Sequence, residues 1–306
     1  MCLPFRSFSP SLLVAASSLL FVACHPAASP NGQTVLVANS SDNAFAEYWY
    51  AGEAEVNTYE FQQSRYGETR EGEAVMVFVT EDFSKSKQVK LDNPDRAGSD
   101  KVSVLKLNHL RHFVTGIYDY SMMLSVFTPV NIDRFPHSFK TTTSSQDWCG
   151  QSFSQLNLED ERYRYSQFSY FEKEGDKSEK IKVDLLEDEL WSRIRISPES
   201  IKEGTYELIP SSFYTRLSHD PPSPRQARIM TNKKENGTVY LVVEYLHLNR
   251  TLTIGYSSTF PFNILSWTEM QDGEIMSKGK LKSTIKSAYW KQHDNQHEYL
   301  RDSIGL

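Results

Sequence analysis

Short runs of β-branched and aromatic residues, ending at turn dipeptides, limit the fold of this chain more than any other feature. The clearest run is Leu281–Tyr289, in which Leu, Ser, Ile, Ser and Tyr alternate with Lys, Thr, Lys and Ala. Such alternation is expected of a strand with one buried face. Asn236-Gly237 and Asp272-Gly273 each separate two such runs, and both dipeptides favour a hairpin whose turn positions have φ > 0. The chain is therefore predicted to be mainly β.

Runs of similar composition recur along most of the chain, and each is predicted to form one or more strands. These runs are 54–66, 73–80, 101–107, 113–130, 139–171, 181–185, 227–231, 239–248, 264–269 and 274–277. Within them, 74–79 is apolar at every position, which is typical of a strand covered on both faces. Residues 92–100 are polar and contain a Pro and a Gly, so a loop is expected there.

Helix signals are few. Apolar residues recur at every fourth position from Leu186 to Ile194, which predicts a helix over 185–195. The acidic run Glu187–Glu189 is expected on the solvated face of this helix. The tail, 290–303, is a second candidate for a short amphipathic helix.

These elements predict a mainly β protein with an antiparallel curved sheet or barrel, lipocalin-like or lipoprotein-carrier-like, and one or two packing helices. Residues 47–306 are expected to form this β-rich domain. The pattern leaves open whether they form one domain or two lobes that meet near 172–180, where Glu174–Lys177 predicts a turn.

Residues 1–23 have the features of an export signal. They carry a single charged residue and an apolar run shorter than the roughly 20 residues that span a bilayer as a helix. The run ends in Phe21-Val-Ala-Cys24, which resembles a bacterial lipobox in which Cys24 is acylated, although Phe21 stands where Leu is usual. The alternative is an ordinary signal peptide that is cleaved near Ala23 or Ala28.

Acylation of Cys24 makes the membrane the first expected partner, because the two or three acyl chains of a lipoprotein give stable attachment. Residues 24–46 are rich in Ala, Ser, Asn and Pro and are predicted to be a flexible tether. His25, rather than Asp, follows the cysteine, which resembles outer-membrane sorting. The predicted location is the bacterial cell envelope, at the outer membrane.

Charge and cysteine content limit the partners and the cross-links. Lys and Arg total 33, Asp and Glu total 39, and the basic residues form no stripe, so no nucleic-acid partner is expected. Of the three cysteines, Cys2 leaves with the signal and Cys24 is acylated. Cys149 therefore has no partner for an internal disulfide.

No catalytic or metal-binding constellation is visible in the sequence, and no cofactor is expected. Cys149 lies among Thr, Ser and aromatic residues, without the helix N-terminus or His partner that activates a thiol, so it is expected to be a packed small residue rather than a nucleophile. His109 and His112 would point to opposite faces of a strand. His293 and His297 have the spacing of one helix face, but they lack the Glu of a zincin helix and lie in a polar tail.

The aromatic content is high, with 17 Phe, 16 Tyr and 5 Trp. On a curved sheet these residues either line a pocket for an acyl chain or another apolar ligand, or fill the core. We favour the core interpretation, because sheets favour these residue types in any case. The pocket interpretation stays open.

Several segments of the sequence resemble a group of uncharacterised lipoproteins from Bacteroidetes. The resemblance extends over most of 47–306, and it implies an envelope lipoprotein with no established activity. The segments are Arg65-Tyr-Gly-Glu-Thr-Arg70, Thr115-Gly-Ile-Tyr118, Asp147-Trp-Cys-Gly150, Phe260-Pro-Phe-Asn-Ile-Leu-Ser-Trp267 and Leu300-Arg-Asp302.

Members of this group often carry the label "septum formation inhibitor Maf", which this sequence does not support. True Maf proteins are cytoplasmic nucleotide pyrophosphatases of α/β fold that open with a strand and a Ser-Pro-Arg-Arg phosphate loop. Here Ser223-Pro-Arg225 is followed by Gln226 and lies late in the chain, in a Pro-rich segment. The position, the β context and the export signal all disagree with Maf chemistry.

The sequence thus predicts a non-enzymatic, membrane-anchored envelope lipoprotein whose β-domain binds an apolar ligand or an envelope protein partner. One alternative is an exported hydrolase that uses Cys149 as its nucleophile together with a distant His. A second alternative is a structural scaffold in an envelope complex.

Overall fold

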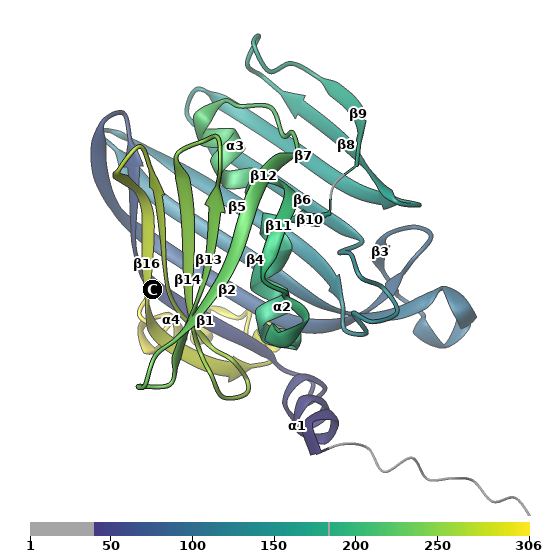
Figure 1. Ribbon diagram of the computed structural model, residues 1–306. Coiled ribbons are helices and arrows are strands. Elements are labelled where there is room, and N and C mark those ends of the chain that lie inside the picture. Colours follow the sequence, from purple (N-terminus) through teal and green to yellow (C-terminus); the bar gives the residue numbers. More distant parts are fainter. Residues whose placement is uncertain (1–39, 183) are drawn as a thin grey trace, which may run out of the picture. The chain divides into compact units, whose positions relative to one another are not determined.

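The predicted strands join into one large, mostly antiparallel sheet in the computed structural model (Figure 1). The structure describes residues 40–182 and 184–306, which belong to one compact unit. The predicted signal peptide, Cys24 and most of the predicted tether lie outside these residues. No helix among the described residues is both long enough and apolar enough to cross a membrane.

The first strand of the chain pairs with the last, so the two halves of the sequence form one continuous sheet. Neighbouring strands are antiparallel except β10 and β11, which are parallel. The short β3 (Val89–Lys90) pairs with β2 off the main path. The others, in spatial order, are β10 (Leu185–Leu186), β11 (Gly204–Ile209), β12 (Arg225–Lys233), β13 (Thr238–Tyr245), β14 (Arg250–Ser257), β15 (Ile264–Gln271), β16 (Glu274–Ser287), β1 (Ala54–Arg65), β2 (Glu68–Ser84), β4 (Lys101–Thr115), β5 (Tyr118–Pro129), β6 (Lys140–Asp147), β7 (Gly150–Glu159), β8 (Arg162–Ser169) and β9 (Lys177–Ile181).

The sheet curls until its two edges approach each other, but it does not close. The edge strands β9 and β10 are not paired with each other. Side chains from both edge regions nevertheless share one hydrophobic cluster, made of Leu156, Tyr163, Tyr165, Ile181, Leu186 and Ile209. The prediction of an antiparallel curved sheet is thus confirmed, and the open edges distinguish it from a closed barrel. Residues 172–180 lie at the β9 edge of this sheet.

The helices are short, and two of them lie within the curve of the sheet (Figure 1). They are α1 (Ser40–Trp49), α2 (Leu190–Ile196), α3 (Ser212–Ser218) and α4 (Leu300–Ser303), with 3-10 turns η1 (Pro94–Arg96), η2 (Gly98–Asp100), η3 (Glu187–Glu189), η4 (Pro198–Ser200), η5 (Tyr289–Lys291) and η6 (Asn295–His297). The predicted helix over 185–195 is confirmed in part: residues 190–196 form α2 and 187–189 form the turn η3, whereas Leu185–Leu186 form the strand β10. Leu190, Trp191 and Ile194 of α2 belong to the main core.

The prediction that Glu187–Glu189 lie on a solvated face was wrong. Glu187, Asp188 and Glu189 are only 1%, 3% and 0% exposed. Because η3 and α2 lie inside the curved sheet, they have no solvated face. Arginines compensate part of the buried charge: Glu187 pairs with Arg250 and Glu189 with Arg193.

Two predicted boundaries also differ. The tail predicted to be helical over 290–303 contains η5, η6 and the single turn of α4, because Asp294 is extended (φ −82°, ψ 152°) and interrupts it. The predicted tether reaches Ala46, whereas Ser40–Ala46 already form part of α1. Phe45 in this helix packs against Phe260, with 6.5 Å between ring centroids.

Turn chemistry explains the hairpins. Asp272 and Gly273 have φ of 53° and 85°, as the dipeptide predicts. At the other predicted hairpin, Gly237 has a positive φ (80°) but Asn236 does not, and the turn is longer than two residues. Both pairs of strands form as predicted.

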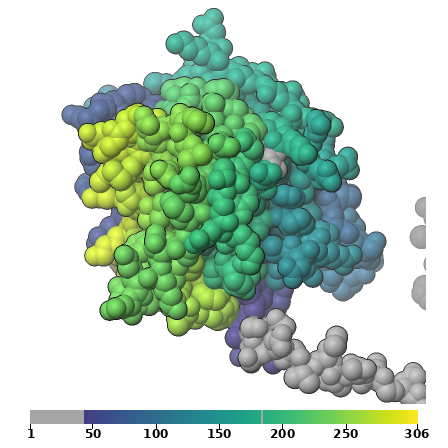
Figure 2. Space-filling model, in the orientation of Figure 1, coloured from purple at the N-terminus to yellow at the C-terminus, as the bar shows by residue number. Residues whose placement is uncertain are grey.

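Many of the large aromatic side chains are buried in the core, whereas others, such as Trp148 and Tyr170, are exposed. Trp267 lies at the centre of the core, with its ring centroid 5.0 Å from that of Tyr59 and 5.8 Å from that of Trp191. A Cβ on Gly279 would lie 2.1 Å from the Trp267 ring, so only glycine lets the indole lie against β16. On the face shown in Figure 2, the green C-terminal strands form a continuous surface over this core.

Candidate functional site

Six hairpin turns and α3 gather at one end of the sheet, here called the α3 end. Because neighbouring strands are antiparallel, this end holds the turns β1–β2, β4–β5, β6–β7, β8–β9, β13–β14 and β15–β16. Hydrogen bonds tie α3 to them: Arg65 donates to the carbonyl of Leu217 (2.7 Å), and Arg216 donates to Glu174 (3.2 Å). Residues 65–70, 115–118 and 147–150 contribute turns to this end.

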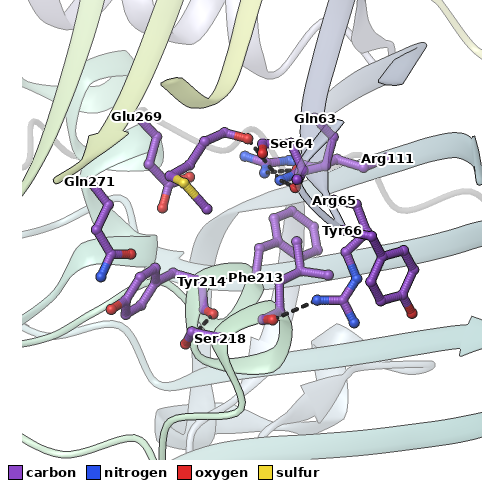
Figure 3. A pocket seen from close by; sticks show the side chains of 13 residues that line it. Gln63, Ser64, Arg65, Tyr66, Arg111, Phe213, Tyr214, Ser218, Glu269 and Gln271 are labelled. Atoms are coloured by element: carbon purple, nitrogen blue, oxygen red, sulfur yellow. Dashed lines mark hydrogen bonds between the residues drawn. The ribbon is translucent and has the colours of Figure 1, made fainter. Parts of the chain in front are cut away.

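A pocket of about 150 Å³ opens at the α3 end, here called the arginine pocket (Figure 3). Figure 3 shows Glu269 and Gln271 of β15 on one side, Gln63 and Arg111 of β1 and β4 on the other, and α3 below. Its lining is Gln63, Ser64, Arg65, Tyr66, Gly67, Arg111, Phe213, Tyr214, Leu217, Ser218, Glu269, Gln271 and Met276. Most of these side chains are polar or charged.

Arg111 is the unusual residue of this pocket. It is 4% exposed, and its guanidinium carbon lies 4.5 Å from the ring centroid of Phe213 and 5.3 Å from that of Phe61. Its hydrogen bonds, to His109 and Gln63, are both long at 3.4 Å. Among the described residues, no carboxylate lies within ion-pair distance of it (4.0 Å). Burial lowers the pKa of Arg111 to about 10, although Glu269 acts to raise it.

Arg250, in contrast, is fully paired. It donates to Glu187 at 2.5 and 2.7 Å and to Glu269 at 2.8 and 2.9 Å. Burial acts to raise the pKa of Glu269, but Arg250 and then Arg111 hold it below its usual value. The carboxylate of Glu269 that lines the pocket is therefore ionised, and it shares the single positive charge of Arg250 with Glu187.

At the mouth of the pocket, Tyr66 is held in a left-handed turn conformation (φ 58°) by its neighbours. The Arg65 guanidinium carbon lies 4.5 Å from the centroid of its ring. Its hydroxyl lies 2.7 Å from that of Tyr120 and 3.2 Å from that of Tyr118. Partial burial acts to raise the pKa of Tyr66, but hydrogen bonds from Tyr118 and Tyr120 and the charge of Arg65 together lower it.

Asp188 gives the folded protein a pH-dependent stability. Burial raises its pKa to about 6 from 3.8, although Ser212 donates to it from its amide (3.0 Å) and hydroxyl (2.5 Å). The folded carboxyl thus keeps its proton to a higher pH than the unfolded one. Stability should therefore fall as the pH rises from about 4 to about 6, by about 3 kcal/mol from this group.

We expect Asp188→Asn to remove this part of the pH dependence. The free energy of unfolding of the variant, relative to wild type, should be higher at pH 7 than at pH 4. Urea unfolding of both proteins at several pH values between these limits measures the difference. Parallel pH profiles for wild type and variant would contradict the raised pKa.

The residues considered from the sequence as catalytic or metal-binding candidates do not come together in one site. The expectation that Cys149 is a packed small residue was wrong: it lies exposed in the β6–β7 turn, where its amide donates to Asp147 (2.6 Å). His109 points inward and His112 outward to Asp119 (3.0 Å), so the two lie on opposite faces as predicted. His293 and His297 lie outside any common helix. Within the described residues, no group of three or more His, Cys, Asp or Glu side chains could hold a metal ion.

The sequence analysis missed the arginine pocket, although one signal was available. In 105–113, the inward positions are Leu105, Leu107, His109, Arg111 and Phe113. Arg111 therefore stands on an otherwise mostly apolar face, where a charged side chain needs a special reason. Its neighbours Phe213 and Glu269 are more than a hundred residues away along the chain, and no local pattern links them to it.

Comparisons with known proteins do not assign a family. No family model and no curated protein matches the sequence. The chain is similar in structure to a crystal structure described as a β-barrel-like protein of domain of unknown function DUF1849 from Brucella abortus. The TM-score is 0.45 at 8% sequence identity, and the match covers 76% of this chain and 97% of that one.

Proposed function

We propose that this chain is a non-enzymatic envelope lipoprotein, anchored through Cys24, whose β-domain binds a small organic carboxylate in the arginine pocket. The observation that carries the proposal is Arg111, a buried guanidinium that lines the pocket with long hydrogen bonds. A carboxylate is planar and accepts two parallel hydrogen bonds from a guanidinium. It would supply the charge-assisted bonds that Arg111 lacks in the described structure.

The charges around the pocket favour a single carboxylate over a phosphate. Arg65 and Arg111 contribute two positive charges to the lining. Arg250 divides its one positive charge between Glu187 and Glu269, so the Glu269 carboxylate repels a second negative charge nearby. A monoanion with a flat head group therefore fits the lining better than a dianion.

The anchoring part of the proposal is supported by the lipobox-like segment ending at Cys24. We expect Cys24→Ala to release the protein from the membrane fraction, because the N-terminal acyl chains would be lost. Fractionation of a bacterial host that expresses the full chain measures this. Wild type is the control, and a variant that stays in the membrane would contradict the anchor.

The hydrolase alternative gains no support from the position of Cys149. Its thiol is exposed at a hairpin turn. The helix at this end of the sheet, α3, is not joined to that turn in the sequence. No His donates to or accepts from Cys149 in the hydrogen bonds of the described residues. The proposed function therefore rests on the arginine pocket and not on Cys149.

The test is a calorimetric titration of the β-domain with hexanoate. We expect wild type to bind, and Arg111→Met to raise the Kd by about 10- to 100-fold, since charge-assisted hydrogen bonds contribute about 1.5–3 kcal/mol. Arg164→Met is the matched control, because Arg164 pairs with Glu159 and is 40% exposed. Hexanol and hexanamide should not bind.

Stability separates binding from folding in this test. Arg111→Met should keep the free energy of unfolding within about 1 kcal/mol of wild type, because the substitution removes a buried cation without breaking an ion pair. A wild-type protein that does not bind hexanoate, or a variant that binds it equally well, would exclude the arginine pocket as a carboxylate site.

A further inference from the structure

One group of exposed apolar side chains leads from the β1–β2 turn at the arginine pocket to the neighbouring hairpin tips. Tyr66 and Gly67 line the pocket and belong to the β1–β2 turn. The next hairpin tip, β4–β5, places Ile117 at 83% exposure, and the β6–β7 tip places Trp148 at 70%. Tyr118 connects them: its hydroxyl lies 3.2 Å from that of Tyr66, and its ring centroid lies 6.5 Å from that of Trp148. Tyr66, Ile117, Tyr118 and Trp148 are here called the aromatic ledge.

The conformations of the hairpin turns hold the residues of the ledge in place. Positive φ angles at Tyr66 (58°) and Gly116 (64°) set the geometry of the first two tips. Tyr66 is further fixed by the Arg65 guanidinium stacked on its ring and by two hydroxyl contacts. An exposed ring that is already held in place loses little conformational entropy when a ligand covers it.

Charge along the ledge sets the polarity of its ligand. Asp119 is 46% exposed and follows Tyr118, and Asp147 precedes Trp148. These carboxylates disfavour a second anionic group, whereas the arginines lie at the pocket end. The pocket thus favours one negative charge and the ledge favours a neutral, apolar extension.

We propose that the ligand is an amphipathic monocarboxylate of the fatty-acid type, whose carboxylate binds Arg111 and whose alkyl chain lies along the aromatic ledge. This inference rests on the proposed function, since it needs a carboxylate in the arginine pocket. It adds the chemical class of the remainder of the ligand. Tyr66, at the pocket mouth, contacts both parts.

The first experiment locates the tail by tryptophan fluorescence. A bromine atom quenches a tryptophan that it touches, so 12-bromododecanoate, kept below its micellar concentration, reports tail contact with Trp148. We expect quenching in wild type and in Trp290→Phe, but not in Trp148→Phe. Trp290 is the matched control because it is also partly exposed (43%) but lies in η5, after the last strand.

The second experiment varies chain length. From hexanoate to dodecanoate, the Kd should tighten by about two- to fourfold for each added CH₂, as expected when apolar chain is buried wholly or in part. Ile117→Ser should flatten this dependence, because the substitution removes an apolar side chain from the ledge. Ile117 is so exposed that this substitution should not disturb folding.

The outcomes separate the two proposals. If hexanoate binds through Arg111 but the Kd does not change with chain length and Trp148 is not quenched, the fatty-acid inference is overturned and the carboxylate site stands. If quenching persists in Arg111→Met, the carboxylate does not anchor the tail, and the inference is also overturned. A short acetylated peptide with a free C-terminal carboxylate that binds more tightly than dodecanoate would replace it with a peptide ligand. If no carboxylate binds, the proposed function is wrong, and the fatty-acid inference that rests on it is wrong as well.

Discussion

Replacing Arg250 with leucine is expected to lower the free energy of unfolding by about 3–5 kcal/mol at neutral pH. Arg250 is 1% exposed and holds Glu187 and Glu269, which are 1% and 6% exposed. The substitution leaves two carboxylates buried without their cation. Equilibrium urea unfolding, followed by circular dichroism, measures the change.

The loss of unfolding free energy in Arg250→Leu should depend on pH in a defined direction. In wild type the lowered pKa of Glu269 adds stability above about pH 4.5, which is lost as the pH falls. Without Arg250 the pKa of Glu269 should rise above its unfolded value, because burial then acts with less opposing positive charge, and stability should fall as the pH rises. The variant should therefore lose more unfolding free energy, relative to wild type, at pH 7 than at pH 4. Arg162→Leu, at an exposed position, is the control, and equal deficits at both pH values would contradict this account.

Arg195→Met is expected to lower the free energy of unfolding by a similar amount, about 3–5 kcal/mol. Arg195 donates to both oxygens of Glu55 at 2.6 Å and to the carbonyl of Pro261 at 2.8 Å, and both side chains of the ion pair are 0% exposed. Tyr48 of α1 also donates to Glu55. The ion pair thus joins α1, β1 and α2, and its loss leaves a buried carboxylate.

A double-mutant cycle distinguishes loss of the pair from loss of volume. Glu55→Gln combined with Arg195→Met should be less destabilised than the sum of the two single variants, because neither charge then remains buried alone. Urea unfolding of the four proteins gives the interaction energy, with Arg228→Met, at an exposed position, as the control. Strict additivity would show that Arg195 acts by packing on Phe78 and Trp49, and not through its charge.

The buried arginines therefore divide by role. Arg195 and Arg250 each hold carboxylates at ion-pair distance, and both should be essential for stability. Arg111 is equally buried but has two long hydrogen bonds. A side chain that contributes little to folding while lining a pocket is a reasonable candidate for binding.

Local patterns predicted the elements that depend on neighbours in sequence. Asp272-Gly273 forms its hairpin because both residues tolerate positive φ, and alternation in 281–287 survives in β16. The helix over 185–195 also follows from its own spacing of apolar residues. The Glu187–Glu189 prediction failed because exposure is not a local property: the partner Arg250 comes from a strand more than sixty residues later.

The sequence by itself determined that the chain is mainly β, that its strands are antiparallel, and that His109 and His112 point to opposite faces. These properties follow from side-chain alternation and turn conformation, which act over a few residues. Only the tertiary structure decided that the sheet stays open, that η3 and α2 are enclosed, and that Arg111 meets Phe213 and lines a pocket with Glu269. Those outcomes depend on the curl of the whole sheet, which brings distant residues together and removes water from charges that the local sequence would leave solvated.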